Sequence, residues 1–121
     1  MYNILFYEDE QGNRPVEDFI DQLDAVAHES KDARIQLEQI IYCLNRLEGK
    51  GTRAGERFTK QISGDIWELR PGGNRILFFG WNRNHFVLLH HFSKVTQKTP
   101  PKEIATARRR MDNWLSKNRK E

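Results

Sequence analysis

Residues 66–78 read IWELRPGGNRILF, and this stretch decides the fold. Successive side chains of a strand point to opposite faces, and the Pro-Gly-Gly-Asn between the two arms is a turn-forming group. With that group as the loop, Leu69 pairs with Ile76 and Trp67 pairs with Phe78. The stretch therefore predicts a β-hairpin with these four side chains on its core-facing side.

The other side of this hairpin carries charged residues. Glu68, Arg70 and Arg75 fall there, and we expect them on an open face with Arg70 opposite Arg75. Two guanidinium groups so close repel each other unless an anion or Glu68 lies between them. As a surface cluster these charges contribute at most about 1 kcal/mol, whereas as paired arginine forks they form a preformed phosphate clamp. The hairpin alone leaves both interpretations open.

Strand patterns flank the hairpin on both sides. Phe58 to Ile62 precedes it, and His85 to Phe92 follows the second arm, which extends to Trp81. Ser63-Gly64-Asp65 and Asn82-Arg83-Asn84 supply the turns between these runs. Four strands joined by short turns predict an antiparallel meander.

The remaining segments are a strand and three helices. Tyr2 to Tyr7 has strand composition, Pro15 fits the first position of a helix, and Ser30 is a good N-cap for a second helix that stops at Gly49 and Gly51. Pro100-Pro101 opens a last helix. We therefore expect one α+β domain over residues 1–121, with an antiparallel sheet, in the order strand, helix hairpin, four-stranded meander and C-terminal helix.

Charge is divided unevenly along the chain. Residues 1–50 carry 5 Lys or Arg and 11 Asp or Glu, a net of −6, whereas residues 51–121 carry 15 and 6, a net of +9. Such a basic half favours a polyanionic partner, although a solvated surface without a partner is the simpler alternative. No membrane span or signal peptide is evident, so we expect a cytoplasmic protein.

Two adjacent histidines lie in the last strand of the meander, and a basic loop follows that strand. His90 and His91 should point to opposite faces of their strand, so only one can look toward Arg70 and Arg75. Lys94 and Lys98 lie in the loop that leads to the last helix. No Cys, His or carboxylate group has zinc-ligand spacing, so we expect neither a metal nor a cofactor.

The string from Lys60 to Ile76, followed by Leu88 to Pro100, resembles the phage-derived HigB-like branch of the RelE/ParE toxin superfamily. The resemblance covers the C-terminal part of the chain well and the N-terminal strand and helices in order only. It implies a compact RelE-like fold and the toxin of a type II toxin–antitoxin system. Such a toxin inhibits translation by cutting messenger RNA on the ribosome, without metal, through attack of a ribose 2′-hydroxyl on the phosphodiester. The implied partners are the ribosome, the message and a helix-turn-helix (HigA-like) antitoxin.

The resemblance also assigns site residues. Such cleavage needs a base, positive charge at the phosphorane and an acid. Arg75 matches the phosphate-binding arginine after the turn and Arg70 a second arginine before it. Lys60 and Lys94 are assigned to charge stabilisation or proton transfer. The competing bases are Glu56, Glu68, His90 and His91, and the expected RNA-binding residues are Lys98, Arg57 and Arg53.

This sequence departs from the family pattern in two places. Ile66 and Glu68 stand where RelE members carry lysines, and a C-terminal catalytic tyrosine has no counterpart, so the identity of base and acid stays open. A ParE-like protein that poisons DNA gyrase without nuclease chemistry is the alternative function, and a catalytically silent RNA-binding protein is a third. Retention of Lys60, Arg70, Arg75 and Lys94 favours the nuclease.

Overall fold

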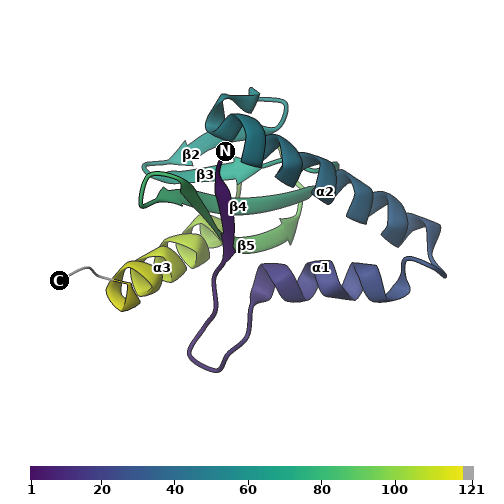
Figure 1. Ribbon diagram of the computed structural model, residues 1–121, viewed down its shortest axis with the longest axis horizontal. Helices are drawn as coiled ribbons and strands as arrows, with labels where there is room; N and C mark the ends of the chain where they lie inside the picture. Colours follow the sequence, from purple (N-terminus) through teal and green to yellow (C-terminus); the bar gives the residue numbers. More distant parts are fainter. Residues whose placement is uncertain (119–121) are drawn as a thin grey trace.

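The computed structural model describes residues 1–118, which form three α-helices and one five-stranded sheet (Figure 1). The strands are β1 Asn3–Phe6, β2 Thr59–Ser63, β3 Ile66–Leu69, β4 Asn74–Trp81 and β5 His85–Ser93. The helices are α1 Pro15–Val26, α2 Lys31–Lys50 and α3 Pro101–Lys117, with a 3-10 turn, η1, at Gly51–Ala54. The predicted α+β class and order of elements are confirmed.

The sheet has the strand order β1-β5-β4-β3-β2. The meander β2 to β5 is antiparallel, and the predicted pairs Leu69 with Ile76 and Trp67 with Phe78 are observed. The first strand, β1, pairs in parallel with β5, so the sheet is mixed and the expectation of a purely antiparallel sheet is wrong for this strand. A parallel neighbour needs a long connection, and the chain between β1 and β5 runs through α1, α2 and the other three strands.

The helix ends follow the expected local rules. Pro15 occupies the first turn of α1, and the Ser30 hydroxyl accepts a hydrogen bond of 3.1 Å from the Ala33 amide at the start of α2. At the other end of α2, Gly51 has a φ of 61°, a conformation that glycine adopts without a steric cost. Pro100 and Pro101 start α3.

Each face of the sheet has its own core. Helices α1 and α2 cover one face and α3 packs against the other (Figure 1). The α1/α2 core contains Val16, Ile40, Cys43, Leu47, Leu69, Ile76, Phe78, Phe86 and Leu88. The α3 core contains Tyr7, Ile66, Leu77, Phe79, Val87, Leu89, Ala107 and Met111. The core-facing side predicted for the hairpin is confirmed, but its other side is covered as well.

A bulge in β5 sets which side chains reach the α3 face. Leu77 pairs with His90 and Phe78 pairs with Leu88, so Leu89 is an extra residue in β5. Leu89 and His90 therefore both point toward α3, and strict alternation resumes at His91. The predicted opposite orientation of His90 and His91 is confirmed.

The hairpin turn contains two glycines with different requirements, which gives a matched test. Gly72 has a φ of 59° and a Cβ there would meet the end of the Gln39 side chain, whereas a Cβ on Gly73 would meet nothing within 4 Å. Gly72→Ala should lower the free energy of unfolding by about 1–2 kcal/mol through left-handed strain. Gly73→Ala should be neutral within about 0.5 kcal/mol. Urea denaturation of both variants checks this, and equal stabilities would show that the turn does not need glycine at 72.

Candidate functional site

A buried carboxylate joins the two hairpin arginines. Glu68 is 3% exposed, and its Oε1 lies 3.3 Å from Arg70 Nε and 3.7 Å from Arg75 Nε. The Thr99 hydroxyl donates to Glu68 Oε2 at 2.5 Å. Glu68 thus lies between the two cations, as their proximity requires, and its two oxygens are shared among three partners.

Arg75 is more enclosed than alternation suggested. It is 8% exposed, and its Nη1 donates to the carbonyls of Gly72 and Asn74, each at 2.8 Å. The expectation of an open face is wrong here, because α3 and the loop before it cover this side of the hairpin. Burial lowers the pKa of Arg75, and the nearby Glu68 carboxylate opposes that shift. The arginine stays charged and fixes the turn.

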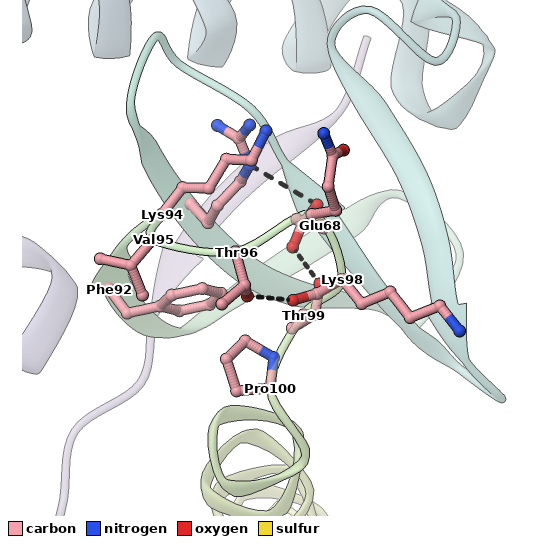
Figure 2. A pocket seen from close by; sticks show the side chains of 10 residues that line it. Glu68, Phe92, Lys94, Val95, Thr96, Lys98, Thr99 and Pro100 are labelled. Atoms are coloured by element: carbon pink, nitrogen blue, oxygen red, sulfur yellow. Dashed lines mark hydrogen bonds and ion pairs between the residues drawn. The ribbon is translucent and has the colours of Figure 1, made fainter.

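The loop from Lys94 to Pro100 is the cover over the hairpin. Its two ends are tied down: the Lys94 amide donates to the Gly73 carbonyl at 2.8 Å, and Thr99 holds Glu68. Figure 2 shows Glu68 near the centre, with Lys98 extending away from it on one side and Lys94 lying on the other side. The cavity between the loop, Arg75 and Glu68 has a volume of about 10 Å³, room for about one water molecule.

A larger opening adjoins this cavity, and we call it the basic groove. Its volume is about 240 Å³. Its lining residues are Lys60, Gln61, Ile62, Glu68, Arg70, Gln97, Lys98, Thr99 and Ile104. Lys60 is exposed on the edge strand β2, directly opposite Glu68 in β3. Three cations around one buried, ion-paired carboxylate make the groove suited to an anion.

The structure brings most of the predicted site residues to this region. Lys60, Arg70, Glu68 and Lys98 line the basic groove, while Arg75 and Lys94 line the small cavity beside it. Arg70 Nη1 also donates to the Glu56 carbonyl at 2.9 Å, which ties the hairpin to the segment before β2. Glu56, Arg53 and Arg57 are exposed in or next to η1, outside the groove lining.

Neither histidine lines the groove. His90 Nε2 lies 2.7 Å from Glu103 Oε1, and its Nδ1 lies 3.2 Å from Arg110 Nη1, both on α3. Burial lowers the pKa of His90, and the hydrogen bond to Glu103 opposes this. His91 lies on the α1/α2 face, stacked on Phe19 with ring centroids 3.5 Å apart. The structure therefore places His91 on the opposite side of the sheet from Glu68 and Arg75.

The sequence analysis did not identify two residues that bind the candidate site residues. Thr99, which binds Glu68 from 31 residues away, was not singled out, and Glu103 was not matched to His90. The hydroxyl and amide side chains in the loop before the last helix were the sequence feature that could have indicated such hydrogen bonds. Their partners could not be named, because alternation gives the side of a strand on which a residue lies and not the segment that packs there.

Within residues 1–118 no three His, Cys, Asp or Glu side chains are grouped so that they could hold a metal ion. No helix in the same range is both long and apolar enough to cross a bilayer. Cys43 is buried in the α1/α2 core, and burial raises the pKa of its thiol.

Comparison with known proteins gives a family and two relatives. The family model described as "Phage derived protein Gp49-like (DUF891)" matches residues 18–112. Two curated proteins, from the CDC 1551 / Oshkosh and H37Rv strains of Mycobacterium tuberculosis, are 48% identical over 59 residues and are named "Probable endoribonuclease HigB1". The aligned part covers 46% of this chain and 46% of each relative, so the chain matches about half the length of these proteins.

The burial of His91 predicts a pH effect. Desolvation lowers its pKa to about 4, whereas the ordinary value is about 6.5. Between these values the unfolded chain binds a proton that the folded chain does not, so stability falls as the pH falls from about 6.5 toward 4. His91→Phe, which keeps the stack on Phe19, should show a smaller loss over this window in urea denaturation. An NMR titration that gives His91 a pKa near 6.5 would contradict the burial argument.

Proposed function

The chain belongs to the family of phage-derived Gp49-like proteins, and we propose that it is a type II toxin that cuts messenger RNA on the ribosome and thereby inhibits translation. The predicted resemblance to phage-derived HigB-like proteins is confirmed at the level of the family. In the proposed reaction the 2′-hydroxyl of a ribose attacks the adjacent phosphorus. The new O2′–P bond forms, the P–O5′ bond breaks, and the leaving 5′-oxygen takes up a proton.

The observation that carries this proposal is the basic groove. Lys60, Arg70 and Lys98 line one opening of about 240 Å³, and they come from three separate segments of the chain. Their converging charges suit a phosphodiester, whose negative charge grows in the transition state. The curated relatives named as endoribonucleases support the same chemistry.

Arg75 and Glu68 act in this proposal through Arg70. The cavity at Arg75 has a volume of about 10 Å³, too small for a phosphate, whereas the groove at Arg70 is open. Glu68 fixes the Arg70 guanidinium, and Arg75 fixes Glu68 and the turn. Arg75 thus fixes the position of Glu68 and of the turn, and its positive charge lies next to the groove without lining it.

We propose Glu56 as the base, because the other candidates are engaged elsewhere. Glu68 is shared among Arg70, Arg75 and Thr99, and His90 is engaged by Glu103. The Glu56 carboxylate is exposed and, within residues 1–118, makes no hydrogen bond or ion pair. Its backbone carbonyl accepts a hydrogen bond from Arg70, which lines the groove, and Glu56 itself lines the neighbouring hollow. A lysine of the groove then supplies the proton for the leaving oxygen, with no metal ion required.

The partners in this proposal come from the resemblance and from the relatives' name. They are the ribosome with its bound message, and a helix-turn-helix antitoxin that keeps the toxin inactive. The place of action is the cytoplasm, where programmed ribosomes are found. The net charge of +9 over residues 51–121 supports binding to RNA, since lysine and arginine displace counterions from phosphates.

Single-turnover cleavage on programmed ribosomes tests the proposed site. Lys98→Ala and Lys60→Ala should each slow cutting about tenfold or more, through lost charge stabilisation. Glu56→Gln should slow it about a hundredfold, since a positioned base contributes at least that much. All three side chains are exposed, so thermal unfolding should change little.

The chain offers matched controls for this experiment. Arg109→Ala and Glu38→Gln remove exposed charges from α3 and α2, away from the groove, and should cut at the wild-type rate. Cutting should be the same with and without EDTA in the cleavage step when the ribosomes stay intact. Wild-type protein that cuts no message, but inhibits DNA gyrase, would replace this proposal with the gyrase-poison alternative.

A further inference from the structure

Edge strand β2 joins the basic groove to a second hollow on the α2 side of the sheet. Lys60 and Gln61 line both openings, and the second has a volume of about 350 Å³. Trp67 lies in its wall, and Thr52 and Glu56 close it from the η1 side. A polymer that leaves the groove at Lys60 can therefore pass round the sheet edge without crossing a packed layer.

Aromatic rings and guanidinium groups lie together between the C-terminal half of α2 and the start of β2. The ring centroids of Tyr42 and Phe58 lie 5.8 Å apart, and the guanidinium carbons of Arg46 and Arg57 lie 4.7 and 5.9 Å from the Phe58 centroid. We call these four residues the cation–aromatic cluster. The Tyr42 side is open, since this residue is 55% exposed, so the cluster presents an aromatic face to solvent.

The charge around the cluster is not neutralised by the protein itself. The segment from Arg46 to Lys60 contains five Lys or Arg and only two acids, Glu48 and Glu56. Within residues 1–118, Arg46, Arg53 and Arg57 form no ion pair with a carboxylate. Arg46 and Arg57 lie against the part-buried ring of Phe58, next to the exposed ring of Tyr42. Basic groups next to exposed aromatic faces are the chemistry that binds single-stranded nucleic acid.

We propose that the hollow and the cation–aromatic cluster form a second RNA subsite, continuous with the basic groove. Single-stranded RNA that leaves the groove crosses β2 at Lys60 and Gln61, and its bases stack on Trp67 and Tyr42. The arginines of the cluster bind the phosphates on either side. This inference rests on the proposed function, because it extends the same RNA strand beyond the cleaved bond. Stacking accepts every base, so the subsite adds affinity with little sequence preference.

Binding of a non-cleavable strand tests the subsite directly. The probe is a fluorescein-labelled 2′-O-methyl pyrimidine strand of about 12 nucleotides, measured by fluorescence anisotropy. Tyr42→Ala should weaken binding about tenfold through the loss of one stacking platform, whereas Tyr42→Phe keeps the ring and should bind like wild type. Arg57→Ala should weaken binding and flatten its salt dependence. The exposed Arg109→Ala on α3 is the control and should change nothing.

A second probe separates bases from phosphates. A strand of the same length with abasic sugars keeps every phosphate and loses every stacking partner. Removing the bases should weaken binding to wild type more than binding to Tyr42→Ala, because the variant has already lost one platform. An equal penalty in both proteins would mean that no base stacks on Tyr42, and it would overturn the subsite. Wild type that fails to bind the intact strand would overturn it as well.

The failure of this inference can be told apart from failure of the proposed function. Lys98 lines the groove and not the hollow, so Lys98→Ala reports on the groove alone. Wild-type RNA affinity in Tyr42→Ala, together with slow cleavage in Lys98→Ala, would remove the subsite and keep the nuclease. Weak RNA binding in Tyr42→Ala, together with normal cleavage in Lys98→Ala, would support the subsite and remove the groove. Cooperative thermal unfolding of Tyr42→Ala near the wild-type temperature excludes unfolding as the cause of lost binding.

Discussion

The carboxylate of Glu68, buried between Arg70 and Arg75, is the interaction on which the site depends. Removing a charge from water is costly unless partners compensate it, and here two guanidinium groups and the Thr99 hydroxyl do so. Each partner is fixed to a different segment: Arg75 to the hairpin turn, Arg70 to the backbone at Glu56, and Thr99 to the loop before α3. Segments that are far apart in sequence therefore meet at one point, and the basic groove opens beside it.

The two faces of the sheet therefore differ: the α3 face borders the basic groove, and the α1/α2 face is packed as a core. On the α3 face the loop from Lys94 to Pro100 covers the hairpin and leaves the groove at its edge. On the α1/α2 face His91 is packed against Phe19 and bonded to Asn74, so it serves the core. At edge strand β2 both faces can be reached, since Lys60 and Gln61 line an opening on each side. A strand that occupies both the basic groove and the second hollow can cross there.

Local rules predicted much of this molecule, and nonlocal packing explains what they missed. Alternation placed the hairpin register and the opposite faces of His90 and His91 correctly, since both depend on neighbouring residues alone. It could not show that the loop before α3 covers Arg75, because that contact depends on a distant segment. The parallel pairing of β1 with β5 was missed for the same reason. The sequence pattern of a short strand does not indicate which strand it pairs with. Of the proposed bases, Glu68 is buried and ion-paired whereas Glu56 is exposed, and the positions of the two residues in the sequence do not reveal this difference.

The role assigned to Glu68 can be tested by the pH dependence of single-turnover cleavage in Glu68→Gln. A positioning group that fixes Arg70 lowers the rate when it is changed, but it leaves the base to titrate as before. The account therefore predicts a slower Glu68→Gln enzyme whose rate still falls at acid pH with the wild-type midpoint. Loss of that acid limb in Glu68→Gln would identify Glu68 as the base itself and would contradict the account.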